Sequence, residues 1–183
     1  MAIFMGNLIQ TRMFEVGDVI QYLQMAVEEN TNLQQGMNYR LKGKRSIFLM
    51  NKGKSAHYED TVEDEGHVII YEGHDVPKSA EHPHSKEVDQ PYSLSSGKLS
   101  QNGKFYEAAI AFKKGERTSE RIRVYEKIRP GLWTYDGLFD LIDAWIQDSG
   151  KRNGNAVLFF AIFGGVKFAR FALLRQTTVV FSL

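Results

Sequence analysis

The stretch YEDTVEDEGHVIIYEGHDVPK, from Tyr58 to Lys78, holds the features that decide the fold. An acidic cluster at its start is followed by an apolar run at residues 68–70 and then by a Tyr-Glu-Gly turn. Acidic runs are ordinarily solvated loops, whereas this one lies between aromatic and strand-forming residues. We therefore predict that His67–Tyr71 is a short buried strand.

Further elements are predicted on both sides of this strand. Residues 46–50 (SIFLM) indicate a second buried strand. Residues 102–115 indicate a helix that ends at a glycine, with Phe105, Ala108, Ala109 and Phe112 on one face. Residues 78–98 are polar and broken by prolines, which is typical of a long loop. Residues 17–29 fit either a helix or a strand followed by a loop.

The clearest alternation of apolar and polar residues lies in RIRVYEKIR, residues 121–129. Ile122, Val124 and Ile128 are expected to face the core. The other face is then cationic around one tyrosine, and it carries Arg121, Arg123, Tyr125, Lys127 and Arg129.

The last part of the chain completes a mixed domain. Residues 130–137 are expected to form a turn-rich link. Residues 138–146 fit either a strand or a helix, and residues 157–163 fit a buried strand. Taken together, these elements predict an α+β fold.

Composition narrows the function classes. A chain of 183 residues suits one domain. It contains no cysteine, which excludes disulfides, zinc–cysteine sites and a thiol nucleophile. The net charge is +1, but acids dominate residues 61–90 and bases lead in residues 98–129. The basic region fits either a phosphate-binding surface or an ordinary solvated face.

No catalytic, metal or cofactor site is predicted. The spacing of the five histidines matches no zinc pattern, and the G-x-S-x-G, Walker and H-E-x-x-H motifs are missing. The apolar run at residues 156–163 is followed by glycines, Lys167 and Arg170, so it fits a buried strand better than a membrane span. The first residues do not resemble a secretion signal, and a cytoplasmic location is expected.

Three ordered motifs, which together cover roughly residues 46–145, resemble the SRA domain (SET and RING associated, also called YDG). They are YEDTVEDEGHVIIYEG, DQPYSLSSGKLSQNGKFYEAA and the YDG of residues 135–137, which is followed by an apolar stretch that reaches Trp145. The segments GHDVPK and RVYEKIRPGLW resemble the bacterial branch that is fused to HNH endonucleases in modification-dependent restriction enzymes.

The resemblance implies a PUA-like, twisted, barrel-like sheet flanked by short helices. It also implies a reader that flips 5-methylcytosine or 5-hydroxymethylcytosine out of double-stranded DNA. In such a reader Tyr58 and Tyr71 would hold the flipped base, and ordinary sheet packing is the alternative for both rings. The family's acid falls on Thr61 or Val62, depending on the direction of counting, so Asp60 or Asp64 would accept the cytosine amino group. The expected base pocket comprises Tyr58, Asp60, Thr61, Asp64, Tyr71, Glu72 and Gly73.

The expected DNA contacts come from the loop motif and the basic region. They are Gln90, Lys98, Asn102, Lys104, Arg121, Arg123, Lys127 and Arg129. Residues 1–160 would form the reading domain. Residues 161–183 would form an apolar C-terminal extension or the start of a lost domain. The alternative functions are a modification-dependent endonuclease that cleaves with Mg²⁺ and a protein- or RNA-binding module on the same sheet scaffold. Homodimerisation stays open.

Overall fold

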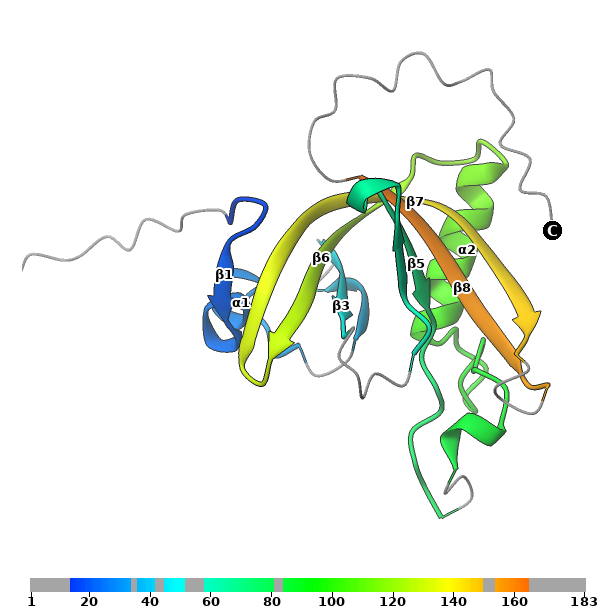
Figure 1. The fold of residues 1–183 in the computed structure, drawn as a ribbon. Coiled ribbons are helices and arrows are strands. Elements are labelled where there is room, and N and C mark those ends of the chain that lie inside the picture. Colours follow the sequence, from blue (N-terminus) through cyan, green and yellow to red (C-terminus); the bar gives the residue numbers. More distant parts are fainter. Residues whose placement is uncertain are drawn as a thin grey trace, which may run out of the picture.

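One mixed sheet of eight strands organises the protein (Figure 1). The computed structural model describes residues 14–33, 36–41, 45–51, 58–80, 84–149 and 154–164. The strand order is β2-β3-β6-β7-β8-β5-β4, and β1 pairs with β7. The pairing of β3 with β6 is parallel and the other pairings are antiparallel. The α+β prediction is confirmed, but within the described ranges β2 and β4 are unpaired ends, so the sheet is not a closed barrel.

The elements follow one another along the chain with these bounds. The strands are β1 (Val19–Gln21), β2 (Met37–Leu41), β3 (Arg45–Met50), β4 (Thr61–Glu63), β5 (Val68–Glu72), β6 (Glu120–Arg129), β7 (Leu132–Asp148) and β8 (Ala156–Gly164). The helices are α1 (Tyr22–Glu28), α2 (Gln101–Lys113) and the short 3₁₀ turns η1 (Asp64–Gly66) and η2 (Ser85–Glu87).

Most of the predicted elements are present. The strands at 46–50, 67–71, 121–129 and 157–163 are confirmed, as is the helix at 102–115. Residues 17–29 contain both of the structures that the sequence allowed, a strand and then a helix. The ambiguous residues 138–146 belong to a strand.

The predicted link at residues 130–137 is wrong beyond its first two residues. The turn is at Gly131, which has φ +76°, and β7 begins at the next residue. Val124 pairs with Gly137 while Tyr125 pairs with Tyr135, so Asp136 is an extra residue on β7. This bulge bends the β6–β7 ribbon, and the φ of +117° at Gly137 suits a glycine there. Figure 1 shows the resulting arch of β6 and β7.

The first core lies between the sheet and α2, which runs along β7 and β8 in Figure 1. Ser100 caps α2 by accepting the N–H of Gly103. Phe105 on α2 packs against Phe48 and Phe160, with ring centroids 4.9 and 6.2 Å away. Full burial of each such ring contributes about 1.5–3 kcal/mol to stability.

A second core lies on the other face of β6, under α1. It contains Met25 of α1, Ile47 of β3 and Tyr125 of β6. The expected cationic face of β6 is therefore wrong at its centre, where Arg123 is 8% exposed and Tyr125 is fully buried. The expected core position of Ile128 is also wrong, because the register shifts near the end of β6 and leaves this residue 52% exposed.

The last described strand, β8, continues to Gly164 and so crosses the expected domain boundary after residue 160. Residues 165–183, which make up most of the expected C-terminal extension, lie outside the described residues. Within the described part of the chain, no helix combines the length and the apolar character needed to cross a membrane.

Candidate functional site

The predicted site residues gather mainly around the end of β5. Tyr71 is 4% exposed, and its ring stacks on Phe48 with centroids 4.2 Å apart. Its hydroxyl donates to the carbonyl oxygen of Leu49 at 3.3 Å. Burial raises the pKa of Tyr71 well above its usual value, and the nearby Asp60 carboxylate and Tyr58 raise it further. Tyr71 is thus a neutral core residue that lies close to Tyr58 and Asp60.

Tyr58 differs from Tyr71 because its ring reaches solvent and is 37% exposed. The Lys86 ammonium lies 4.8 Å from the centroid of this ring, within the range of a cation–π contact. The imidazole of His74 lies 6.4 Å away, centroid to centroid. An exposed aromatic face of this kind can stack on a planar ligand.

Alternation along the strands places two predicted pocket residues on the opposite side of the sheet from Tyr71. The side chain of Glu72 turns to that side and is 2% exposed. Its carboxylate accepts the backbone N–H of Glu59 at 2.5 Å and the Gln90 amide at 3.2 Å. Thr61 pairs with Ile70 and shares that side. Glu72 and Thr61 therefore do not direct their side chains toward the side of Tyr71.

The structure separates the two candidate acceptors that the sequence left open. Asp60 precedes β4, and its Oδ1 accepts the N–H of Glu72 at 2.9 Å, beside Tyr71. Asp64 begins η1, at the other end of the β4–β5 hairpin. Only Asp60 lies near both tyrosines.

Two amide side chains hold the segment that follows β5. Gln90 donates to the carbonyl of Gly73 at 2.7 Å, and its oxygen accepts the N–H of Leu158 at 3.0 Å. Asn102 accepts the N–H of His74 and donates to the carbonyl of His74, both at 2.8 Å. A Cβ on Gly73 would lie 2.7 Å from the Gln90 oxygen, so this close approach requires glycine.

Both amides were predicted to contact DNA, but the structure buries them. Gln90 is 4% exposed and Asn102 is 1% exposed. Their polar atoms serve the backbone of residues 73–74, so they position the site rather than line a surface.

His74 is a site residue that the sequence analysis missed. Burial lowers its pKa to about 4, with the Asp75 carboxylate opposing this shift, so the imidazole is neutral at pH 7. A Cβ on Gly36 would lie 2.8 Å from the His74 Nε2 and 2.6 Å from the Tyr71 hydroxyl. His74 and Tyr71 thus converge on the same glycine. The adjacency of His74 to the Tyr-Glu-Gly turn was the available sequence signal.

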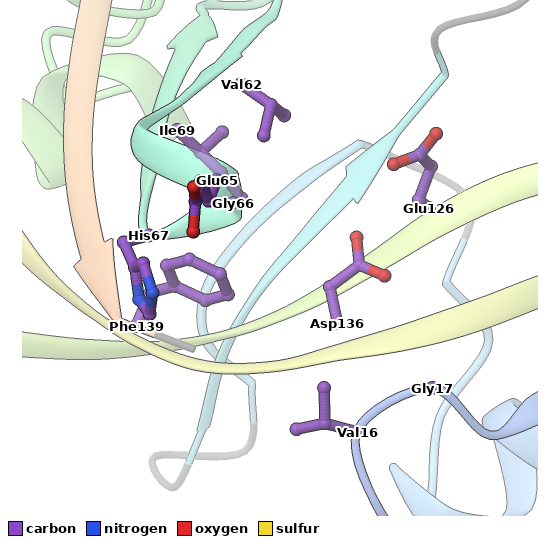
Figure 2. Close-up of a pocket in the computed structure, with 10 residues that line it drawn as sticks. All are labelled: Val16, Gly17, Val62, Glu65, Gly66, His67, Ile69, Glu126, Asp136 and Phe139. Atoms are coloured by element: carbon purple, nitrogen blue, oxygen red, sulfur yellow. The ribbon is translucent and has the colours of Figure 1, made fainter. Parts of the chain in front are cut away.

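Two hollows flank the β4–β5 hairpin on opposite sides. The inner hollow, of about 330 Å³, is bordered by Val62, Ile69 and Phe139. Figure 2 shows Glu126 and Asp136 on its β6–β7 side and His67 on its η1 side. The outer hollow, of about 520 Å³, is lined by Tyr58, Glu59, Asp60, Thr61, Glu63, Ile70, Trp145, Gln147 and Phe159. Tyr71 borders neither of these hollows.

The predicted DNA-contacting cations divide into exposed and buried groups. Arg123 pairs with Glu28 at 3.5 Å and with Glu29 at 3.0 Å beneath α1, so it is not available to phosphates. Lys104 and Lys127 are half-buried. The exposed members are Lys98, Arg121 and Arg129.

No group of His, Cys, Asp and Glu side chains in the described residues is arranged to hold a metal ion.

Comparisons with known proteins place this geometry in a structural context. No family model matches the chain, and no curated protein matches its sequence. An SRA domain of SUVH5 in complex with hemi-methylated CG DNA is similar, with a TM-score of 0.58 and 22% identity. That similarity covers 84% of this chain and 90% of the other.

Two further solved structures are similar at lower identity. The SUVH5 SRA domain bound to fully hydroxymethylated CG DNA has a TM-score of 0.54 and 20% identity, with the same coverage. The modification-dependent restriction endonuclease TagI has a TM-score of 0.54 and 16% identity, and the similarity covers 84% of this chain and 50% of that one. The chain therefore has the fold of the SRA domains.

Proposed function

We propose that this protein binds double-stranded DNA and reads 5-methylcytosine or 5-hydroxymethylcytosine by flipping the base against Tyr58 at the end of β5. The observation that carries this proposal is the exposed Tyr58 ring beside Asp60 and Tyr71, in a fold whose solved neighbours include SRA domains bound to modified CG DNA. We also propose that the protein is cytoplasmic and that it belongs to the bacterial branch of SRA domains that is fused to HNH nucleases.

The chemistry of the site suits an extruded cytosine. The Tyr58 face supplies stacking, which is worth about 1–3 kcal/mol per base. Asp60 is the acceptor that we assign to the cytosine amino group, because that edge of the base offers a donor. Extrusion costs a few kcal/mol of unstacking, which contacts from Lys98, Arg121 and Arg129 to phosphates would offset. Burying one methyl adds less than about 1 kcal/mol, so preference over plain cytosine should be several-fold.

Fluorescence anisotropy with labelled duplexes that carry one modified or one unmodified cytosine tests the proposal. Tyr58→Ala should weaken binding of the modified duplex by about ten-fold or more, because stacking is lost. Tyr58→Phe keeps the ring and should stay within about two-fold of the parent. Equal affinity of the parent protein for both duplexes would show that it does not read the modification.

The second candidate is a modification-dependent endonuclease, which the similarity to TagI raises. Incubation of methylated plasmid with the purified chain and Mg²⁺ separates the two functions. The plasmid should stay intact if the chain only reads DNA, and modification-dependent cleavage would establish the endonuclease instead.

A further inference from the structure

We propose that the outer hollow is a second binding site, which takes an arginine-bearing basic peptide of a partner protein. The hollow lies on the side of the β4–β5 hairpin that Thr61, Glu63 and Ile70 face, opposite to the side of Tyr71. Its volume of about 520 Å³ lies within the range of small-ligand sites. Tyr58 and Asp60 border this hollow as well as the proposed base site, whereas the proposed DNA-reading function assigns no role to Glu63, Trp145 or Phe159.

The floor of the hollow is aromatic. Trp145 of β7 and Phe159 of β8 are direct cross-strand partners, and their rings lie nearly parallel, 5.7 Å apart with 18° between planes. The indole N–H of Trp145 donates to Gln147 at 2.9 Å, which fixes the ring over the sheet. Half-buried Ile70 continues this apolar surface across β5. A flat cation can stack on such a surface, and an alkyl chain can pack on it.

The rim of the hollow is acidic. Glu59, Asp60 and Glu63 border it from the β4 side, and none of the described residues that line it is Lys, Arg or His. A site with this charge repels phosphates and attracts cations. The hollow therefore suits a positively charged ligand and not the backbone of DNA.

Arginine fits this combination better than lysine does. Its guanidinium is planar, stacks on aromatic rings and pairs with carboxylates through a fixed fork of donors. The same neighbourhood already holds one cation on a ring, since the Lys86 ammonium lies 4.8 Å from the centroid of Tyr58. An arginine-bearing peptide could lay a guanidinium on the aromatic floor while the acids of the rim attract its positive charge.

NMR titration of the ¹⁵N-labelled full chain tests the inference. The probe is a short acetylated and amidated peptide with two arginines separated by glycine, and the control peptide carries citrulline, which keeps the shape and removes the charge. The arginine peptide should shift the amides of Thr61, Glu63 and Ile70 and the indole N–H of Trp145. The citrulline peptide should not shift them, and a lysine peptide should bind more weakly.

Matched variants isolate the rim charge. Glu63→Gln should weaken binding of the arginine peptide by roughly two- to five-fold, as expected for the loss of a partly solvated ion pair. Glu65→Gln removes the same charge two residues away, at the border of the inner hollow, and should leave the affinity unchanged. Equal effects of both variants, equal binding of citrulline, or shifts confined to other surfaces would overturn the inference. None of these outcomes depends on whether the chain reads modified cytosine.

Discussion

At the scale of single residues, the site depends on side chains that serve the backbone more than on those that face a ligand. The side-chain amide of Asn102 accepts the backbone N–H of His74 and donates to the carbonyl of His74. It thus makes the pair of hydrogen bonds that a neighbouring strand would otherwise provide. The same Asn102 amide donates to the carbonyl of Pro91 at 3.2 Å. One side chain thus fixes residues from two distant segments.

Asn102→Asp should therefore destabilise the fold although it preserves the shape of the side chain. The carboxylate can still accept the His74 N–H, but it cannot donate to the carbonyls of His74 and Pro91. We expect a loss of about 3 kcal/mol in the free energy of unfolding, measured by urea denaturation. Gln101→Glu is the matched control, because it retains the oxygen that accepts the Tyr39 N–H at 2.8 Å. Equal losses in both variants would contradict this role of Asn102.

His74 predicts a specific dependence of stability on pH. Its pKa is lowered from 6.5 to about 4 in the folded protein, so the unfolded chain binds more protons between these values. Stability is then unaffected by His74 above pH 6.5 and falls as the pH decreases toward 4. The loss should reach about 3 kcal/mol at pH 4. In urea denaturation across this range, His74→Gln should flatten the dependence, and an unchanged slope would contradict the buried neutral imidazole.

The sequence predicted the identities of several site residues but not their orientations. Tyr58 and Tyr71 are the same residue type on either side of one acidic run, yet one ring is exposed and the other is stacked on Phe48. Phe48 comes from β3, and no local pattern reports that contact. The buried roles of Gln90 and Asn102 likewise depend on β8 and on residues 73–74, which are distant in sequence.

At the scale of elements, the contact between α1 and β6 determines which cations are available for binding. The helix α1 ends at Glu28. The next residue, Glu29, pairs with Arg123, and its side chain is only 1% exposed. Glu29 also accepts the hydroxyl of Tyr125 at 2.5 Å. Because of this network, the centre of β6 is buried and offers no surface for binding.

Removing one charge of the Glu29–Arg123 pair should lower the free energy of unfolding. Glu29→Ala leaves Arg123 buried without its main partner, and we expect a loss of about 3–5 kcal/mol in the free energy of unfolding. Replacing both charges, as Glu29→Leu with Arg123→Met, should recover much of that loss. Lys113→Ala removes half of an exposed pair with Asp143 and should cost less than about 1 kcal/mol. Additive losses at Glu29 and Arg123 in a double-mutant cycle would contradict the coupling.

The two-residue period at residues 121–129 predicted the strand β6 correctly. The prediction that one face of this strand is exposed and cationic was wrong at its centre. Alternation shows that Arg123 and Tyr125 share a face, but not what covers that face. The covering element lies about 95 residues earlier in the chain, as the contact from Arg123 to Glu28 shows. Long-range packing of this kind carries no signal in a local pattern. The bulge at Asp136 was missed for a related reason, since Tyr-Asp-Gly is also a common turn sequence.

At the scale of the whole molecule, the fold class and most elements could be predicted, because they depend on local periodicity and on three ordered motifs. Closure of the sheet could not be predicted, since it depends on whether its end strands β2 and β4 meet. The open sheet leaves hollows on both sides of the β4–β5 hairpin. Acids border both hollows, whereas exposed Arg121 and Arg129 lie on β6.

This separation of charge leads to a prediction for DNA binding as a function of salt. Arg121 and Arg129 are exposed near the two ends of β6, whose centre is buried, and a strand of this length places them at most about 26 Å apart, so both can reach phosphates of one duplex. Each phosphate contact contributes about 0.9 to the slope of log affinity against log salt. Arg121→Gln and Arg129→Gln should each reduce this slope by about 1, and the double variant by about 2, in anisotropy titrations between 50 and 200 mM salt. Lys114→Gln, at the exposed end of α2, removes the same charge away from β6 and should leave the slope unchanged. If Lys114→Gln lowers the slope while the two arginine variants do not, the duplex lies along α2 instead of β6.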